Sequence, residues 1–424
     1  SAMDDWDFSP PPPSGLGDHD VPQEGLHLRG KRVALLVTGG IAAMKAPFIA
    51  RALRRQGADV VAFASSEGLR YVAEEALSWS TTHSVVTRLT PAAEHLSDDA
   101  PFDAYLVAPA TYNTINKMRH GIADTVITAT LGSALGRMEQ GRTQVLVAPT
   151  MHGSLHTNIL TESLRVLDGM GVRIIPPRED YGKHNIPEEE RLVAEVCRAV
   201  SQSPLKGRRV LVTGGPTPVP IDAVRRITNR FSGRLGILVA DELFLRGAEA
   251  LLIHAGGATQ PPGYLPHRTA DTFDDYLALV MGALDEDDYE AGVFTAAVAD
   301  YRPQEVREGK TPSGGALNTI TLVPTPKVIR RVRQAHPDLH MVTFKFEEGV
   351  SHEALMETAR QRLQEGSQTV VANRGEEAEA AGRQVAYLVT AEGESPRLLG
   401  KRAIARAIAE HLEAALATDR PAVS

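Results

Sequence analysis

Short runs of β-branched and apolar residues alternate along most of the chain with longer stretches whose apolar residues recur every three or four positions. This alternation is typical of right-handed βαβ units, so it predicts parallel sheets covered by helices. A short polar stretch at 201–204 divides the strand-like runs into two sets. The runs are 33–37, 60–64, 105–108, 145–148 and 172–175, then 210–213, 251–254, 293–296, 341–344 and 370–372. The sequence therefore predicts an α/β protein with two doubly wound, Rossmann-like domains.

The chain has 424 residues, which is more than one ordinary core supports. We expect a disordered tail at 1–28, because its prolines and acidic residues cannot bury enough apolar surface to offset the entropy of ordering. The first domain is predicted at 29–200 and the second at 207–420. A helical stretch at 401–416 has apolar residues at helical spacing and should pack on the second sheet.

The composition limits the partners and the compartment. No apolar run approaches the ~20 residues that a membrane-spanning helix needs. The formal net charge of −8 gives no general attraction for nucleic acid. The single cysteine, Cys197, excludes an internal disulfide framework and favours the reducing cytoplasm. We therefore expect a cytoplasmic protein that can bind small anions through local groups of charge.

The segment 210–236, VLVTGGPTPVPIDAVRRITNRFSGRLG, is the strongest candidate for such a group. A strand-like run ends in Gly214 and Gly215, and a helical pattern begins only after Gly233. In open α/β sheets, ligands bind at the carboxyl ends of the strands, where glycines let the backbone approach an anion. Amides at the helix start attract negative charge. Three arginines add positive charge: Arg225, Arg230 and Arg234. The loop predicts a phosphate site.

The same string resembles the opening loop of phosphopantothenoylcysteine synthetases, in which Gly-Pro-Thr, Ile-Asp-x-Val-Arg and Ile-Thr-Asn-x-x-Ser-Gly-x-x-Gly follow one another. TAAVADYRP at 295–303, FKFE at 344–347 and VAN at 371–373 fit the same family. The resemblance implies that a nucleoside triphosphate activates the carboxylate of phosphopantothenate as an acyl-nucleotidylate, which the amine of cysteine then displaces. One departure is TPVP at 217–220, where the family has Thr-Arg-Glu-Pro, so one charge is absent.

The resemblance also implies roles for single residues. Asn229 would contact the acyl-nucleotidylate, Lys310 would offset the charge of the transferred phosphate, and Arg225 would act in the second step, near cysteine. Mg²⁺ would accompany the triphosphate, with no protein ligand assigned to it, and the choice between CTP and ATP stays open. The implied substrate-binding residues of this domain are Asp222, Ala296, Ala297, Asp300, Phe344, Lys345 and Asn373.

The first domain carries three shorter motifs: TGGIAAMK at 38–45, APATYNTINK at 108–117 and GIAD at 121–124. A tight turn or a helix cap explains any one of them alone. Together they resemble the flavin-binding family of cysteine decarboxylases, which includes phosphopantothenoylcysteine decarboxylase. The resemblance implies FMN as cofactor. The implied contacts are Gly39, Gly40, Ile41, Ala42, Lys45 and Ser65 near the phosphate, and Ala108, Pro109, Ala110, Thr111 and Asn113 beside the isoalloxazine ring.

In that family a histidine precedes the APAT strand, ahead of an acidic residue, and His95 and Asp103 stand at the matching places. The resemblance makes His95 the acid/base group, although a lone loop histidine is ordinarily just solvated. Met151 and His152 occupy the family's Pro-x-Met-Asn substrate loop, where an imidazole can still donate a hydrogen bond to a carboxylate.

The flap segment 179–186 lacks the cysteine that donates a proton in many bacterial members. Cys197 lies instead in an amphipathic run that favours a buried core position. Tyr181, Lys183 or His184 could supply the proton, or the reaction could stop at an enethiol.

The two resemblances together predict a bifunctional enzyme of coenzyme A biosynthesis that ligates cysteine to phosphopantothenate and then decarboxylates the product. Its first domain is expected to form trimers with FMN near the subunit interface, and trimers can join into a dodecamer. One alternative is a paralogue that acts on another cysteine-derived thiol in secondary metabolism. Another is a flavin-binding regulatory protein without turnover, which does not explain the intact ligase motifs.

Overall fold

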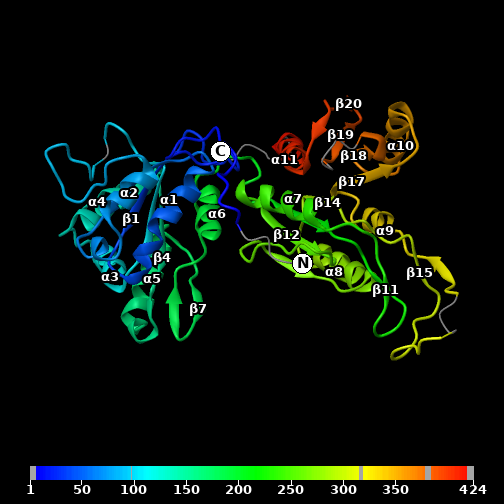
Figure 1. Cartoon of the computed structure of the whole chain (residues 1–424), viewed down its shortest axis with the longest axis horizontal. Helices are drawn as coiled ribbons and strands as arrows, with labels where there is room; N and C mark the ends of the chain where they lie inside the picture. Colours follow the sequence, from blue (N-terminus) through cyan, green and yellow to red (C-terminus); the bar gives the residue numbers. More distant parts are fainter. Residues whose placement is uncertain (1–5, 97, 315–318, 378–382, 418–424) are drawn as a thin grey trace. The chain divides into compact units, whose positions relative to one another are not determined.

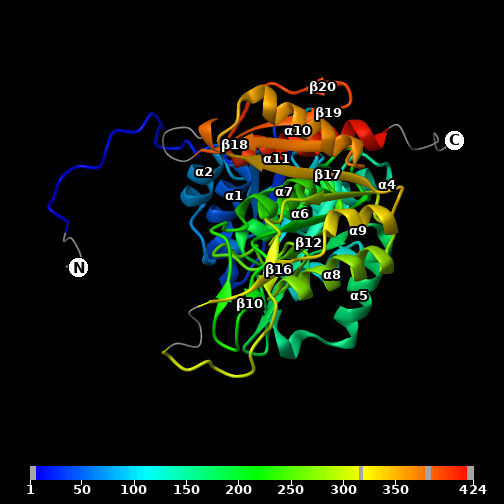
Figure 2. The ribbon, with the colours of Figure 1, turned by 90° about the vertical axis from the view of Figure 1, so that its right-hand side faces the viewer.

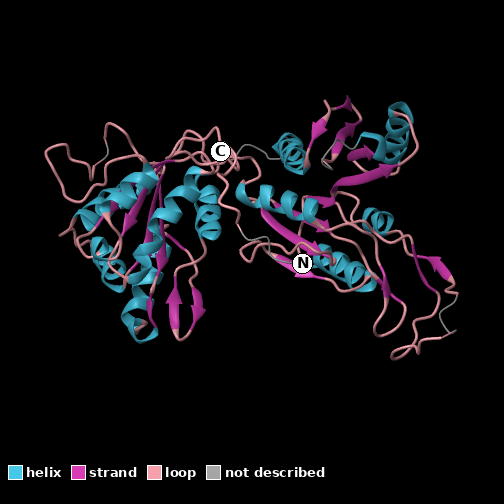
Figure 3. Ribbon diagram, in the orientation of Figure 1, coloured by secondary structure: helices cyan, strands magenta, loops and turns pink. Residues whose placement is uncertain are grey.

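The computed structural model describes residues 6–96, 98–314, 319–377 and 383–417 (Figure 1). The chain divides into two compact units, 1–200 and 201–424. Figure 3 shows helices and strands mixed throughout both units, as an α/β protein requires. Residues 1–5 of the predicted tail and 418–420 of the predicted second domain lie outside the described residues.

The first unit is built on a parallel sheet with the strand order β2-β1-β3-β4-β6. Its strands are β1 (Arg32–Val37), β2 (Asp59–Ala64), β3 (Ala104–Ala110), β4 (Gln144–Pro149) and β6 (Arg173–Ile174). Every residue of β3 is buried, because apolar residues on both faces of a parallel strand need helices on both sides. The predicted strands of this domain are confirmed, and β6 is shorter than expected.

Six helices surround this sheet among the described residues: α1 (Ala46–Arg54), α2 (Glu74–Thr81), α3 (Tyr112–His120), α4 (Val126–Glu139), α5 (Asn158–Met170) and α6 (Glu189–Val200). Side chains of α3, α4 and α5 share one core cluster with the sheet, for example Ile115, Leu131 and Leu160. Helices α1 and α6 contact each other, and α6 also contacts β3. Short 3-10 turns follow three strands: η1 (Ile41–Lys45), η2 (Gly68–Arg70) and η3 (Gly153–Leu155).

A small antiparallel sheet stands beside the parallel one in the order β5-β8-β7. It consists of β5 (Met151–His152), β7 (Arg178–Asp180) and β8 (Lys183–Asn185). We call the β7–β8 hairpin, residues 178–185, the flap. Since β5 follows β4 directly, the flap lies next to the carboxyl edge of the main sheet (Figure 1).

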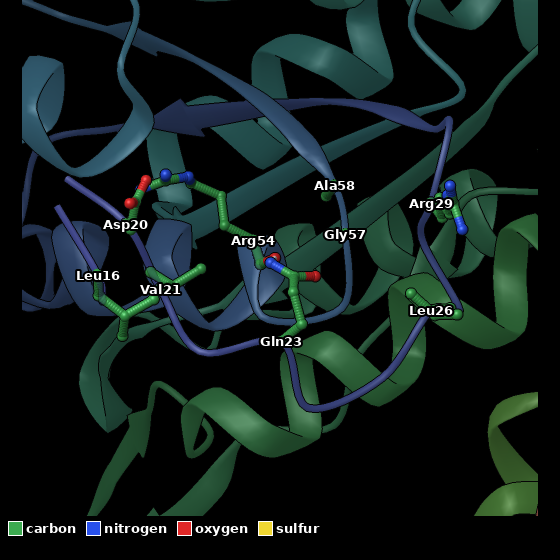
Figure 4. Close-up of a pocket in the computed structure, with 9 residues that line it drawn as sticks. All are labelled: Leu16, Asp20, Val21, Gln23, Leu26, Arg29, Arg54, Gly57 and Ala58. Carbon is green, nitrogen blue, oxygen red and sulfur yellow. The ribbon is translucent and has the colours of Figure 1, made fainter. Parts of the chain in front are cut away.

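The segment predicted as a disordered tail differs from that expectation over part of its length. Residues 6–28 form no helix or strand, yet Val21 and Leu28 are buried. The amide of Leu28 donates to the carbonyl of Gln56 (2.8 Å), just beyond α1. Arg54 of α1 reaches across a pocket of about 480 Å³ and donates to the carbonyl of His19 (Figure 4). Two apolar side chains and backbone hydrogen bonds therefore hold a segment that we expected to bury too little.

The second unit contains a larger sheet in the order β13-β12-β9-β14-β17-β18-β19-β20, with β21 paired to β19. The strands are β9 (Arg209–Gly214), β12 (Glu249–His254), β13 (His267–Thr269), β14 (Ala291–Phe294), β17 (His340–Glu347), β18 (Thr369–Arg374), β19 (Val385–Thr390), β20 (Gly393–Glu394) and β21 (Leu398–Leu399). The pairs from β13 to β18 are parallel, which confirms the predicted class. From β19 onward the pairing is antiparallel, which the alternation pattern did not indicate.

The helices of the second unit are α7 (Arg234–Leu245), α8 (Phe273–Glu286), α9 (Val328–Ala335), α10 (His352–Gln364) and α11 (Lys401–Ala417). Helix α11 was predicted to pack on the second sheet; it contacts β19 and β21 of that sheet and packs also on α7, with Ile404, Ile408 and Leu412 buried. Helices α8 and α9 contribute to a core cluster with Leu211 and Met341 of the sheet. A 3-10 turn, η4 (Gly375–Glu377), follows β18. No described helix is both apolar enough and long enough to cross a membrane.

Two ribbons extend from the second unit at the carboxyl side of its sheet (Figure 2). One pairs β10 (Val219–Pro220) with β11 (Arg226–Ile227), and the other pairs β15 (Tyr301–Pro303) with β16 (Leu322–Pro324). The long loop predicted between 214 and 233 thus contains a ribbon. Because β10 and β15 contact each other, the ribbons place two distant stretches of sequence side by side.

Candidate active sites

The loops after β1 and β3 meet at the carboxyl edge of the first sheet. The hydroxyl of Thr38 donates to the carbonyl of Pro109 (2.5 Å). A Cβ on Gly39 would lie 2.6 Å from Cβ of Glu67, so only glycine fits there. In the sheet, β2 lies on one side of β1 and β3 lies on the other, so the strand order reverses at β1. The loops after β1 and β3 flank this topological switch point, where doubly wound sheets bind ligands.

Ser65 and Thr111 complete this edge. Oγ of Ser65 accepts from the amide of Gly68 (3.0 Å), and the amide of Ser65 donates to the carbonyl of Val37 (3.1 Å). Thr111 caps α3 by accepting from the amide of Thr114 (3.2 Å). The predicted FMN contacts therefore lie at the end of β3 and on the loops that follow β1, β2 and β3. Ala108 and Ala110 are buried, whereas Ile41, Lys45 and Asn113 are exposed.

His95 is not brought to these loops. Its neighbour Leu96 accepts a hydrogen bond from Arg137 in the last turn of α4, which ends shortly before β4 begins. Oδ2 of Asp103 accepts from the amide of Arg32 (2.8 Å), the first residue of β1. Leu96 and Asp103 therefore place the segment that carries His95 at the edge of the sheet where the strands begin. The seven residues of β3 separate this edge from the flavin loops by roughly 20 Å.

The loop that carries His95, between α2 and β3, is drawn in cyan, at the opposite end of the unit from the flap (Figure 1). Nδ1 of His95 is buried without a hydrogen-bond partner in the described part of the chain. The family resemblance implied that His95 acts beside the APAT strand. The fold of a single chain does not place them so.

The substrate loop and the flap form one structure. Met151 pairs with His184, and His152 pairs with Lys183. Nδ1 of His152 accepts from the amide of Ser154 (3.1 Å), which leaves Nε2 for other partners. Nε2 of His184 lies 2.6 Å from Nδ1 of His156, so one of these two rings donates to the other.

The three groups considered as proton donors differ in their surroundings. Tyr181 lies at the tip of the flap with 88% of its side chain surface exposed, and Lys183 is also exposed. His184 is half-buried and pairs with His156, a residue that the sequence did not single out. Cys197 is 1% exposed within α6, which confirms its predicted core position.

The glycine loop of the second unit packs backbone against backbone. Gly215 has φ 90°, and a Cβ there would lie 2.7 Å from the carbonyl oxygen of Gly256. Gly233 has φ 82° and begins α7, and the amide of Arg234 donates to Oγ of Ser232 (3.3 Å), so it is the next amides of the first turn, those of Leu235 and Gly236, that can meet an anion. β9 has β12 on one side and β14 on the other, so this loop also lies at a switch point.

His254, the last residue of β12, forms part of the floor beneath this loop. The ring is fully buried, and neither nitrogen has a well-formed hydrogen bond to a described residue. Burial lowers the pKa of His254 below its ordinary value, and the Thr259 backbone opposes that shift only in part. Sequence reasoning missed this residue; its only signal was a polar residue at the end of an apolar strand.

Asn229 lies against the loop that follows β14. Its Nδ2 donates to the carbonyl of Ala297 (2.8 Å), and the amide of Ala297 donates to the carbonyl of Gly215 (3.1 Å). Thr217, also missed from sequence, accepts from the amide of Ala299 (2.7 Å). The structure therefore unites Asn229, Ala296 and Ala297 with the glycine loop.

Asp222 requires a correction, because the resemblance made it a substrate-binding residue. Its side chain is fully buried and accepts hydrogen bonds from the amides of Val224, Arg225 and Thr311 and from Nη1 of Arg225. These donors, led by the Val224 amide, hold the pKa of Asp222 well below its ordinary value. Its carboxylate is occupied by the protein itself.

The remaining predicted residues line the carboxyl ends of later strands. Phe344 and Lys345 lie near the end of β17, and the register places Asn373 of β18 opposite Phe346. Nζ of Lys345 lies 3.4 Å from Glu347. Asp300 is exposed and pairs with Lys327 (3.0 Å). These residues lie at the same edge of the sheet as the glycine loop, whereas the loop that bears Lys310 is bound to the tip of the β10–β11 ribbon, where the amide of Ala223 donates to the carbonyl of Gly309 (3.0 Å).

Two Rossmann-like sheets with a candidate site at each switch point define the chain as a two-domain α/β protein with nucleotide-type sites. The first unit matches the family described as "Flavoprotein" over residues 22–201. The second matches the "DNA/pantothenate metabolism flavoprotein C-terminal domain" over residues 205–416. The first unit is therefore a flavoprotein domain.

Similar proteins extend over both units. The chain is 36% identical to the coenzyme A biosynthesis bifunctional protein CoaBC of Thermococcus kodakarensis, covering 82% of this chain and 86% of that protein. It is 30% identical to CoaBC of Bacillus subtilis, covering 79% and 85%. The solved C-terminal domain of a CoaBC protein is 28% identical and covers 51% of this chain and 100% of that one, with a TM-score of 0.43. The chain belongs to the CoaBC family of bifunctional coenzyme A biosynthesis proteins.

Proposed function

We propose that the second unit ligates cysteine to 4'-phosphopantothenate and that the first unit decarboxylates the resulting phosphopantothenoylcysteine to phosphopantetheine. Both are steps of coenzyme A biosynthesis. The observation that supports this most is the gathering of Asn229, Ala296–Ala297 and the glycine loop at one switch point, beside the loop that bears Lys310. Family membership over both units supports the coupling of a ligase with a decarboxylase.

In the ligase unit, the amides of Leu235 and Gly236 in the first turn of α7 and the exposed Arg230 and Arg234 would attract the triphosphate. The amide group of Asn229 would contact the acyl-nucleotidylate without adding charge. Lys310 is exposed and has no ion pair with a described residue, so its charge is free to offset the transferred phosphate. Mg²⁺ would neutralise the triphosphate, and CTP or ATP would be the donor.

In the decarboxylase unit, Gly39 packs against Glu67 of the loop after β2 and Gly40 faces Thr111 of the loop after β3, so the bare backbone of this turn would form the cradle for a flavin phosphate. FMN, when bound, would accept a hydride from the cysteine Cβ and later return it. Loss of the hydride from Cβ and of the thiol proton would leave a thioaldehyde; the electron pair released with CO₂ then forms the Cα=Cβ bond and the C=S π pair moves onto sulfur, giving an enethiolate. The exposed Nε2 side of His152 would hold the carboxylate that leaves.

The position of His95 gives the predicted trimer a role. We place FMN near a subunit interface, so His95 would serve as acid/base group at the flavin of a neighbouring copy. Apolar side chains next to the flavin loop support such an interface, since Ile41 and Phe48 are 70% and 62% exposed. The cytoplasm remains the expected compartment.

One observation favours the alternative in which the thiol product stays an enethiol. The flap has no cysteine, and the only thiol of the chain, Cys197, is buried in α6. The test is mass spectrometry of the products after purified protein receives phosphopantothenate, cysteine, Mg²⁺ and either triphosphate. Phosphopantetheine supports the proposal, and a product lighter by two hydrogens supports the alternative. Absence of phosphopantothenoylcysteine and of both decarboxylated products with either triphosphate would refute the ligase assignment.

A further inference from the structure

The buried carboxylate of Asp222 is saturated by donors from two separate loops. Oδ1 accepts from the amides of Val224 (2.9 Å) and Arg225 (2.7 Å), which closes a turn within its own loop. Oδ2 accepts from Nη1 of Arg225 (2.8 Å) and from the amide of Thr311 (3.1 Å). A carboxylate offers about four acceptor positions, so the described contacts leave none for a ligand.

Further hydrogen bonds tie the same two loops together. The amide of Ala223 donates to the carbonyl of Gly309 (3.0 Å). Nη1 of Arg225 also donates to the carbonyl of Thr311 (3.1 Å). Lys310 lies between Gly309 and Thr311, so its backbone is fixed on both sides while its side chain stays exposed.

We propose that Asp222 is a positioning residue of the ligase: it holds the Arg225 guanidinium and the Lys310 loop as one unit before substrates bind. This inference rests on the proposed function for the roles of Arg225 and Lys310. Aspartate suits the task because one oxygen orders its own turn while the other reaches the second loop. Groups held in place before the reaction need no reorganisation when charge develops in the transition state.

Arg225 is therefore anchored on one side only. Its Nη1 atom is bound to Asp222 and to the Thr311 carbonyl, and 35% of its side chain is exposed. The rest of the guanidinium fork can face a ligand. The anchored side sets the direction in which the fork points, which matters more for a planar group with fixed donors than for a lysine.

The variant Asp222→Asn tests this most sharply because it keeps the shape of the side chain. In either orientation of the amide, its NH₂ group would face two donors instead of accepting from them. We expect pyrophosphate release and amide formation both to fall by ~10²-fold, as expected for misplaced catalytic groups. Arg225→Gln should slow only amide formation, and adding it to Asp222→Asn should slow that step little further than Asp222→Asn alone.

Hydrogen exchange provides a readout that does not depend on catalysis. In Asp222→Asn, amides within 223–225 or 307–311 should exchange faster than in the wild-type protein. The matched control is Glu413→Gln, since Glu413 also pairs with an arginine of this unit, Arg246 (2.6 Å), but lies on α11. The control should leave exchange in both segments and both rates unchanged.

Each outcome decides the inference. Unchanged exchange in both segments would show that Asp222 does not join the loops. Faster exchange with wild-type rates of both steps would show that the junction does not position the reaction. If the wild-type protein makes neither phosphopantothenoylcysteine nor a decarboxylated product of it, the proposed function fails, while the exchange result still decides whether Asp222 holds the two loops together.

Discussion

Replacing Gly233 by alanine should damage the ligase site while leaving the flavin unit intact. The φ of 82° places residue 233 in the left-handed region, which costs a residue with a Cβ about 1–2 kcal/mol. The added Cβ would also lie 2.8 Å from Cε1 of His254 and 3.2 Å from Cα of Gly215. Relieving such contacts in a packed region costs about 1–3 kcal/mol. The free energy of unfolding of the second unit should therefore fall by about 2–5 kcal/mol.

For a unit of this size, that loss lowers the melting temperature by roughly 4–20 °C. Pyrophosphate release per folded molecule should also fall, because the first amides of α7 move away from the triphosphate. The measurements are differential scanning calorimetry, pyrophosphate release and the flavin spectrum. Gly282→Ala is the control: a Cβ at that position in α8 meets no heavy atom within 4 Å, so this variant should be slightly stabilised. A Gly233→Ala protein with wild-type melting and turnover would refute the packing argument.

The remaining predictions concern both sites. Asn229→Asp and Lys310→Gln should each slow pyrophosphate release strongly, since either change adds net negative charge beside the phosphates; a wild-type rate would contradict the assignment. His95→Asn should lower CO₂ release by ~10²–10⁴-fold with FMN still bound, and mixing it with a Gly39→Val protein should restore release if His95 acts across subunits. Because buried His254 stays neutral while the unfolded chain takes up a proton below pH 6.5, the melting temperature should fall as the pH drops below that value, and less so in His254→Gln.

Much of the fold was predictable because it depends on local patterns. Buried parallel strands need continuous apolar runs. The run at 145–148 is short and lies between two helical stretches, so it predicts a strand. The antiparallel edge from β19 to β21 carries a similar apolar pattern, because the direction of a strand depends on how it is connected to its neighbours and not on its own residues. The burial of Val21 and Leu28 depends on a surface offered by α1, which the tail's own composition does not reveal.

The sequence predicted which residues belong to each site, but it did not predict how all of them are arranged in space. Loops that follow neighbouring parallel strands must meet at the same edge, so the gathering of Gly39, Ser65 and Pro109 follows from topology. His95 does not follow a strand of the sheet but lies in a long connection that runs from one edge to the other. Its distance from the flavin loops was therefore not fixed by its spacing along the chain. The same holds for His184, whose partner His156 depends on how the flap folds back.

Asp222 shows why a motif can identify a residue and still leave its task open. Within IDAVR, the carboxylate and the guanidinium stand three residues apart, and either could have faced a ligand. The contact that determines the role of Asp222 comes from Thr311. Its amide lies 89 positions further along the chain and donates to the second carboxylate oxygen. Because a buried carboxylate must be compensated, that single long-range donor makes Asp222 internal and turns Arg225 outward. A contact outside the IDAVR motif thus determines which of its side chains can face a ligand.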